Sequence, residues 1–193
     1  DLVFTALKST KDSIDTIKGR AHIISSEFTK LYRRVEKERW KHVHGCGLRV
    51  VCQIRSLLHE CGACIPPTTR NFEQQQQAVM EGCAKLAQYL EKFVEKPVNG
   101  AAPDKLVLMR LMSGLGQGFS ALVDMALSFL LRTMLESVVS PASPYSLKAT
   151  LSHLVSLGLE GEHMCYLITR EGGIECLFEL CRSDAYKFAH AQA

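Results

Sequence analysis

Histidine and cysteine, the side chains that most often bind zinc, are concentrated between positions 42 and 64. Structural zinc sites need four ligands that converge from paired spacings. His42 and His44 make a poor pair, because side chains two residues apart on a helix point in different directions. Cys61 and Cys64 have the spacing of a redox motif but lack its strand-helix-strand setting. We therefore predict no metal and no cofactor for this group, which consists of His42, His44, Cys46, His59, Cys61 and Cys64.

A second candidate for chemistry is the glycine-rich stretch from Gly114 to Gly118, with glycine at every second position. A dinucleotide-binding loop has a similar composition, but it follows a strand and opens a helix. Here the helical pattern continues on both sides, so we interpret the glycines as small residues for close helix packing. The sequence also contains no nucleophile elbow, zinc-protease signature or phosphate loop. We predict that the protein is not an enzyme.

The strongest concentration of charge lies between Lys30 and Lys41, which holds six basic and two acidic residues together with Tyr32 and Trp40. A basic, partly aromatic stripe can bind RNA, an anionic membrane surface or an acidic protein groove. It can also be a solvated helix surface opposite an apolar stripe, which we favour. The net charge of the whole chain, +3 from 23 basic and 20 acidic residues, is too small to indicate nucleic-acid binding.

The elements that must position these residues are helices. Apolar residues recur every seven positions from 7 to 35, which predicts a long amphipathic helix with coiled-coil character. One line is Leu7, Ile14, Ala21, Phe28 and Val35, and the adjoining line is Ile17, Ile24 and Leu31.

Three further long helices are expected before position 140. The first follows Trp40 and ends at Pro66-Pro67, and Gly45 and Gly47 mark either a kink in it or a join between two helices. The second is expected from a cap at Thr68 or Asn71 to Lys96, before Pro97 and Asn99-Gly100. The third spans 106–131. Although it is apolar, Asp124 and Gln117 argue against a membrane span.

The segment from Ser140 to Pro144 is the expected domain boundary, with Ser143 as the cap of a new helix. Gly172-Gly173 should then separate two short helices, because glycine adopts the left-handed conformation at a helix end. We expect Ile174, Leu177, Phe178 and Leu180 to form a buried stripe. These features predict an all-α protein, a long-helix bundle over 1–139 followed by the start of an armadillo-like α-solenoid over 140–193.

Such solenoid units normally stack in about three copies, so an array that stops at Ala193 is expected to be truncated. Eight cysteines, mostly inside apolar helical patterns, indicate reduced thiols and hence a cytoplasmic protein.

Three stretches together resemble the asymmetry domain of Inscuteable proteins. They are Glu38-Arg-Trp-Lys-His-Val-His44 continuing into Leu48-Arg-Val-Val-Cys52, the helix from Leu115 to Leu127, and Cys165-Tyr-Leu-Ile-Thr-Arg-Glu-Gly-Gly-Ile174 through Arg182. The resemblance covers most of the chain and is strongest around Trp40 and in the last thirty residues.

The resemblance implies an adaptor for spindle orientation in asymmetric cell division, recruited from the cytoplasm to the cell cortex. It would link the tetratricopeptide domain of Pins/LGN to the Bazooka/Par polarity complex. The family's groove-binding peptide precedes its helical domain, so here it either lies upstream of Asp1 or involves the first helix. The expected partner-binding residues are Leu7, Ile14, Phe28, Lys30, Arg33, Arg34, Lys37 and Trp40.

The apolar seam of the first helix and the unfinished repeat also suggest a homo-oligomer formed by exchange of helices. The competing function is that of a basic helical module that binds RNA or an anionic membrane surface.

Overall fold

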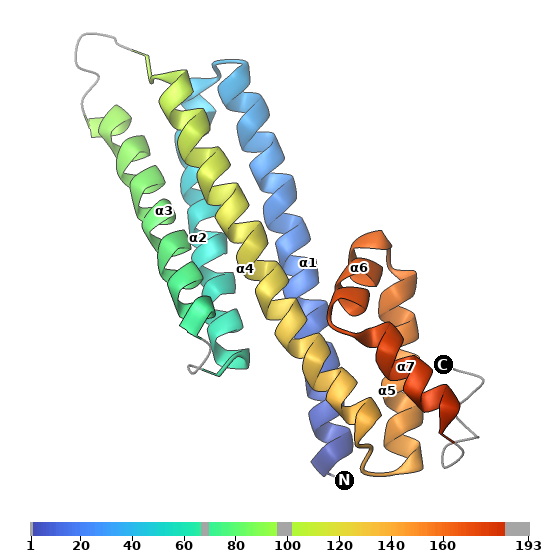
Figure 1. Cartoon of the computed structure of the whole chain (residues 1–193). Helices are drawn as coiled ribbons and strands as arrows, with labels where there is room; N and C mark the ends of the chain where they lie inside the picture. Colours follow the sequence, from blue (N-terminus) through green and yellow to red (C-terminus); the bar gives the residue numbers. More distant parts are fainter. Residues whose placement is uncertain (1, 67–69, 96–101, 184–193) are drawn as a thin grey trace. The chain divides into compact units, whose positions relative to one another are not determined.

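A computed structural model describes residues 2–66, 70–95 and 102–183, and every regular element in these ranges is an α-helix (Figure 1). The predicted all-α fold is confirmed. The helices are α1 (Leu2–Glu36), α2 (Trp40–Cys64), α3 (Arg70–Glu95), α4 (Lys105–Val139), α5 (Pro144–Leu159), α6 (Glu162–Arg170) and α7 (Gly173–Arg182).

The chain forms two compact units whose boundaries fall inside the long helices α1 and α4. One unit consists of Asp1–Thr16 and Ala126–Ala193, and the other of Ile17–Met125. We call the first the α5–α7 unit and the second the long-helix unit. The division into domains 1–139 and 140–193 stays a prediction, although α4 does end at Val139 and α5 does begin at Pro144.

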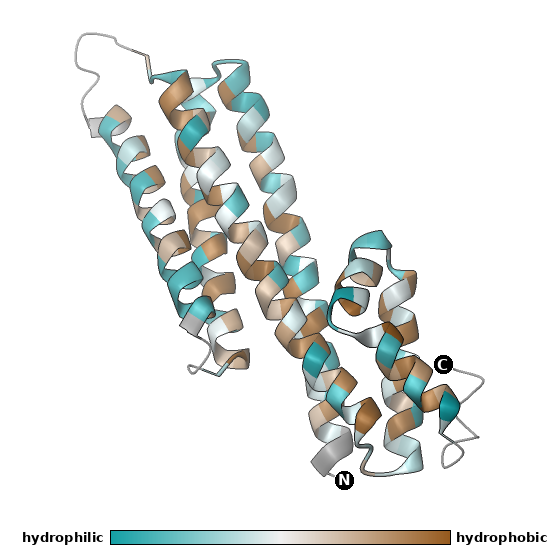
Figure 2. Ribbon diagram, viewed as in Figure 1, coloured by the Kyte–Doolittle hydropathy of each residue, from teal (hydrophilic) through white to brown (hydrophobic). Residues whose placement is uncertain are grey.

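The seven-residue apolar repeat of α1 lies mostly in the core. Ile17, Ile24 and Leu31, the second line of the repeat, are all buried. On the first line Leu7, Ile14 and Val35 are buried, whereas Ala21 and Phe28 are half-buried. Figure 2 shows the corresponding alternation of hydrophobic and hydrophilic residues along the long helices. The repeat thus serves packing within the chain.

Helix α2 is continuous through both of its early glycines, which settles the alternatives that the sequence left open. Gly45 is exposed and has open space around its Cα atom. Gly47 is buried, and a Cβ atom there would overlap the side chain of Leu90 on α3. The absence of a side chain at Gly47 therefore lets α2 and α3 approach closely at this point.

Two of the four consecutive glutamines tie α3 to its neighbours. Gln75 Nε2 donates to the backbone oxygen of Gly118 on α4 at 3.0 Å, and Gln76 Nε2 donates to that of Leu58 on α2 at 3.2 Å. Sequence reasoning assigned no role to these side chains, since glutamine is simply a good helix former. The cap expected at Thr68 and the stop at Pro97 and Asn99-Gly100 lie outside the described residues, and Asn71, the alternative cap, lies inside α3.

Helix α4 runs through the glycine-rich stretch and continues to Val139, beyond its expected end at 131. Gly114, Gly116 and Gly118 are all helical, so the stretch is not a nucleotide-binding loop. A Cβ atom on Gly118 would lie 3.4 Å from the Val79 side chain, consistent with close packing against α3. None of the described helices has the length and apolarity required to cross a bilayer.

In the α5–α7 unit, the expected helix boundaries are confirmed. The Ser143 hydroxyl oxygen caps α5 by accepting a hydrogen bond from the backbone N–H of Ser146, and the Ser146 hydroxyl oxygen accepts one from the backbone N–H of Ser143. Gly172 has the left-handed φ of +87° between α6 and α7. The prediction of a buried stripe on α7 is wrong in part. Leu180 is buried, but Ile174 and Phe178 are exposed.

The two glycines of α2 give a test of the packing between α2 and α3. Gly45→Ala should raise the free energy of unfolding by about 0.5–1 kcal/mol, because alanine is the better helix former and meets no neighbour. Gly47→Ala should lower it by about 1 kcal/mol or more, because the added methyl group displaces the buried Leu90 side chain. Chemical denaturation followed by circular dichroism measures both, and equal shifts of the two variants would contradict the packing described.

Candidate functional site

The turn between α6 and α7 requires glycine at two consecutive positions. Gly172 takes the left-handed conformation that disfavours a side chain. At Gly173 a Cβ atom would lie 2.8 Å from the backbone oxygen of Ile168, which leaves no room for one. This tight turn fixes the direction of Glu171, the residue just before the glycines.

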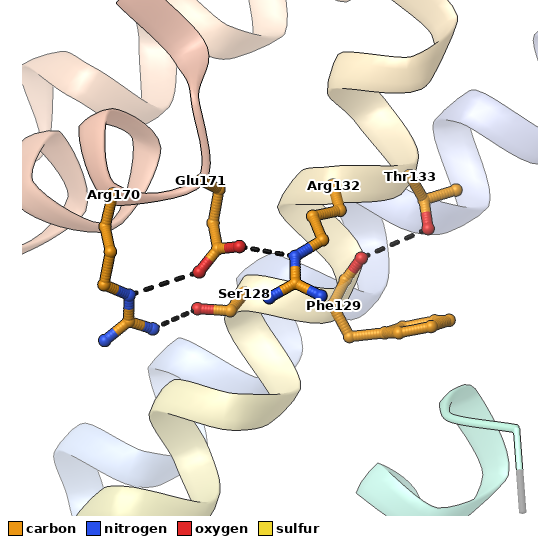
Figure 3. A network of polar contacts seen from close by, with 6 residues as sticks. All are labelled: Ser128, Phe129, Arg132, Thr133, Arg170 and Glu171. Carbon is orange, nitrogen blue, oxygen red and sulfur yellow. Dashed lines mark hydrogen bonds and ion pairs between the residues drawn. The ribbon is translucent and has the colours of Figure 1, made fainter. Parts of the chain in front are cut away.

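Glu171 is the centre of a polar network inside the α5–α7 unit (Figure 3). Its side chain is only 6% exposed. Arg132 on α4 donates from Nε to one carboxylate oxygen at 2.5 Å, and Arg170 donates from Nε to the other at 3.2 Å. Arg170 also donates to the Ser128 hydroxyl and lies over the Tyr166 ring, 5.6 Å from its centre. The network joins the α6–α7 turn to α4.

The charges in this network satisfy one another. Burial by itself would raise the pKa of Glu171, but hydrogen bonds from Arg132, Ser128 and Arg170 outweigh it and hold the pKa below its ordinary value. Glu171 is therefore an anion at neutral pH, locked between two guanidinium groups. The lowered pKa and the two arginine partners make this carboxylate a weak proton acceptor, so the arrangement suits structural attachment better than acid–base chemistry.

A cavity of about 340 Å³ adjoins the network. The Cys176 thiol lines this cavity, and its pKa is raised, first by burial and then by the nearby Glu175 carboxylate, so it stays protonated and weakly nucleophilic. The lining residues are Arg132, Leu135, Glu136, Val139, Ser140, Glu171 and Cys176.

The α5–α7 unit also exposes several large apolar side chains. Phe178 is 67% exposed and Leu159 is 83% exposed. Scattered exposed apolar residues are ordinary, whereas a group of them on one face marks a protein-binding surface, so we take those on the three short helices as a candidate for one. We call them the α5–α7 apolar set: Tyr145, Val155, Leu159, Tyr166, Ile174 and Phe178.

The expected partner-binding residues, which extend from α1 to the start of α2, differ in burial. Leu7 and Ile14 are buried, so contact with a partner would require α1 to separate from its neighbours; their role in binding stays a prediction. Phe28 and Trp40 are half-buried.

The basic members of that expected set differ in their contacts. Lys30 pairs with Glu27 at 2.7 Å, and half-buried Arg34 donates to the Cys46 sulfur. Arg33 and Lys37 are exposed and make no ion pair with any described residue. Of the four, Arg33 and Lys37 are thus the most available to a partner.

The histidine and cysteine candidates do not come together. Among the residues that the structure describes, no three His, Cys, Asp or Glu side chains are placed to hold a metal ion. All eight cysteines lie in the described residues, and no disulfide joins any of them. Burial raises the pKa of Cys61 to about 12, with the Cys64 thiol adding to the effect, so Cys61 is not a reactive thiolate.

Comparison with known proteins identifies sequences related to this chain. A family model described as the C-terminal part of protein inscuteable matches residues 20–193. The chain is 26% identical over 194 residues to a protein inscuteable homolog from Homo sapiens and 25% identical to one from Mus musculus. Both alignments take in the whole chain but only 34% of each relative, so the chain spans about a third of their length. No solved structure matches the chain.

The ion pairs of Glu171 give a pH-dependent prediction. Because the folded-state pKa lies below the unfolded value near 4.5, the pairs stabilise the fold fully above that pH and are lost as pH falls through the folded pKa. Glu171→Gln should therefore lower the free energy of unfolding by about 2 kcal/mol at pH 7, and by progressively less below pH 4.5. Thermal unfolding across pH measures the difference.

The matched control is Glu175→Gln, which makes the same change at an exposed position on α7. It should leave stability nearly unchanged at every pH. A Glu171→Gln variant as stable as the wild type at pH 7 would show that the network does not hold the turn.

Proposed function

Because the chain belongs to the Inscuteable family, we propose that it is a non-enzymatic adaptor that binds two other proteins through separate helical surfaces. In this proposal it links the tetratricopeptide domain of Pins/LGN to the Bazooka/Par polarity complex during spindle orientation in asymmetric cell division. The observation that carries the proposal is the match of the C-terminal inscuteable model to residues 20–193. Recruitment of the protein to the cell cortex is part of the same proposal.

The first surface would be the α5–α7 apolar set. Aromatic and aliphatic side chains that stand out from a rigid scaffold are the usual energetic centre of a protein interface. Here rigidity would come from the Glu171 network and the glycine turn, which hold α7 and its exposed Phe178 relative to the end of α4. We assign this surface to the polarity complex.

The second surface would be the exposed basic residues at the end of α1 and in the turn that follows it, as the sequence led us to expect. Arg33 and Lys37 make no ion pair within the described residues, so they can pair with acidic side chains without breaking a contact. Charged residues at the edge of an interface mainly set partner choice and association rate. We assign this surface to the tetratricopeptide domain.

The test is a binding titration of the purified chain with each partner domain in solution, without lipid. Phe178→Ala should weaken binding of the polarity partner at least about tenfold and leave the tetratricopeptide domain unaffected. Arg33→Glu should do the reverse and act mainly on the association rate. Ile23→Ala, at an apolar position on α1 that is 55% exposed, is the control and should change neither.

An adaptor must also hold both partners at once. Size-exclusion chromatography of the three proteins should give a ternary complex. Mutual exclusion of the partners, or failure of both to bind, would overturn the adaptor proposal. Light scattering on the same samples tests the expected exchange of helices between copies, which a strict monomer would refute.

A further inference from the structure

One end of the long-helix unit brings together basic and apolar residues that are far apart in the sequence. Lys105, the first residue of α4, donates from Nζ to the backbone oxygen of Glu36 at 2.9 Å and lies 3.9 Å from the Glu38 carboxylate. The start of α4 is therefore held against the turn between α1 and α2 (Figure 1). We call this end the basic tip: Arg33, Lys37, Arg39, Trp40, Lys41, Lys105, Leu106 and Val107.

Positive charge at the basic tip is only partly compensated. Arg33, Lys37, Arg39 and Lys41 are exposed and form no ion pair in the part of the chain that the structure describes.

Most of the nearby acidic groups are already engaged. The Asp104 carboxylate accepts hydrogen bonds from the backbone N–H groups of Leu106 and Val107 at 2.9 and 3.3 Å, and Glu38 faces Lys105. Of these acidic residues, Glu36 remains to balance the charge of the four basic side chains. The balance favours a negatively charged partner.

The same tip exposes aliphatic side chains. Leu106 is 68% exposed, and Val107 next to it is also exposed. Trp40, at the start of α2, is half-buried. Lysine and arginine around a small group of aliphatic residues, with a tryptophan at the edge, are the composition of surfaces that settle into the headgroup region of a bilayer.

The aliphatic residues decide between possible anionic partners. RNA would use the basic groups and an aromatic ring for stacking, but it gains little from contact with leucine and valine. A bilayer that contains anionic lipid uses both parts, because the basic groups are attracted to its headgroups and the aliphatic groups leave water. The juxtaposition therefore fits a lipid surface best.

We propose that the basic tip docks on an anionic membrane surface, with Leu106 and Val107 at the level of the headgroups and Lys37, Arg39 and Lys41 facing anionic lipid. The contact is peripheral and involves no spanning segment. This inference goes beyond the adaptor function and does not rest on it, because it requires neither protein partner.

The chain contains a single tryptophan, so its indole fluorescence reports on the basic tip alone. Vesicles of phosphatidylcholine mixed with phosphatidylserine should shift the emission of Trp40 to the blue, and pure phosphatidylcholine vesicles should not. Lipids brominated on the acyl chain should quench Trp40 in the mixed vesicles. Added salt should reverse both effects, because the attraction to anionic headgroups is screened.

Two matched pairs of variants separate the charge from the apolar contact. Lys37→Glu should weaken vesicle binding about tenfold, whereas Arg55→Glu, about 22 Å further along α2 from Trp40, should not. Leu106→Glu should weaken binding by a similar factor, whereas Ile23→Glu, about 20 Å before Glu36 on α1, should not. Each replaced side chain is exposed, and circular dichroism checks that each variant folds.

The outcomes distinguish the proposals. Absence of phosphatidylserine-dependent binding would overturn the membrane proposal, as would vesicle binding that Leu106→Glu leaves intact. Binding of a single-stranded RNA that is lost in Lys37→Glu but kept in Leu106→Glu, without vesicle binding, would assign the tip to nucleic acid instead. Leu106→Glu should bind both protein partners normally in the absence of lipid, so a failure here is separable from a failure of the adaptor proposal.

Discussion

Burial of the apolar stripes of the long helices is the constraint on which the rest of this structure depends. A stripe residue such as Ile24 or Leu31 on α1 contributes about 1.5–3 kcal/mol when it leaves water, and most of the large apolar residues of α1, α2 and α3 are buried in this way. Close approach of the helices, as where Gly47 meets Leu90, completes the burial. Large apolar residues that stay exposed despite this constraint are the informative exceptions.

Many of these exceptions belong to two parts of the chain that differ in chemistry. On the short helices they include Phe178 and Leu159, and the nearby charges of Glu171 are already paired inside the protein. At the start of α4 they are Leu106 and Val107, beside basic residues that lack ion-pair partners among the described residues. The first combination suits contact with an apolar surface of another protein. The second suits contact with an anionic membrane, whose interior is apolar. A protein carrying both would hold the partner of its α5–α7 apolar set at a membrane, while the tetratricopeptide domain and lipid would compete for Arg33 and Lys37.

The charged residues also fall into two groups, those paired inside the protein and those exposed to water. Glu171 lies between two arginines and attaches a turn to a helix, which is a structural role. Lys37 and Arg39 lie in water with no partner in the described part of the chain, where they add nothing to folding. In the sequence the two groups look alike, because Arg170 precedes Glu171 as Lys37 precedes Glu38. Only their burial separates a pair that stabilises the fold from groups available for binding.

The sequence by itself determined the helical class, the heptad seam of α1, the cap at Ser143 and the glycine turn at Gly172, because each depends on residues within one or two helical turns. It could not determine whether Gly45 and Gly47 break a helix, or that Ile174 and Phe178 face solvent, because the answers depend on which neighbours cover each side of a helix. The Glu171 network and the basic tip join residues 39 and 69 positions apart, respectively. No local pattern encodes such contacts, so tertiary structure alone decided where the candidate binding surfaces lie.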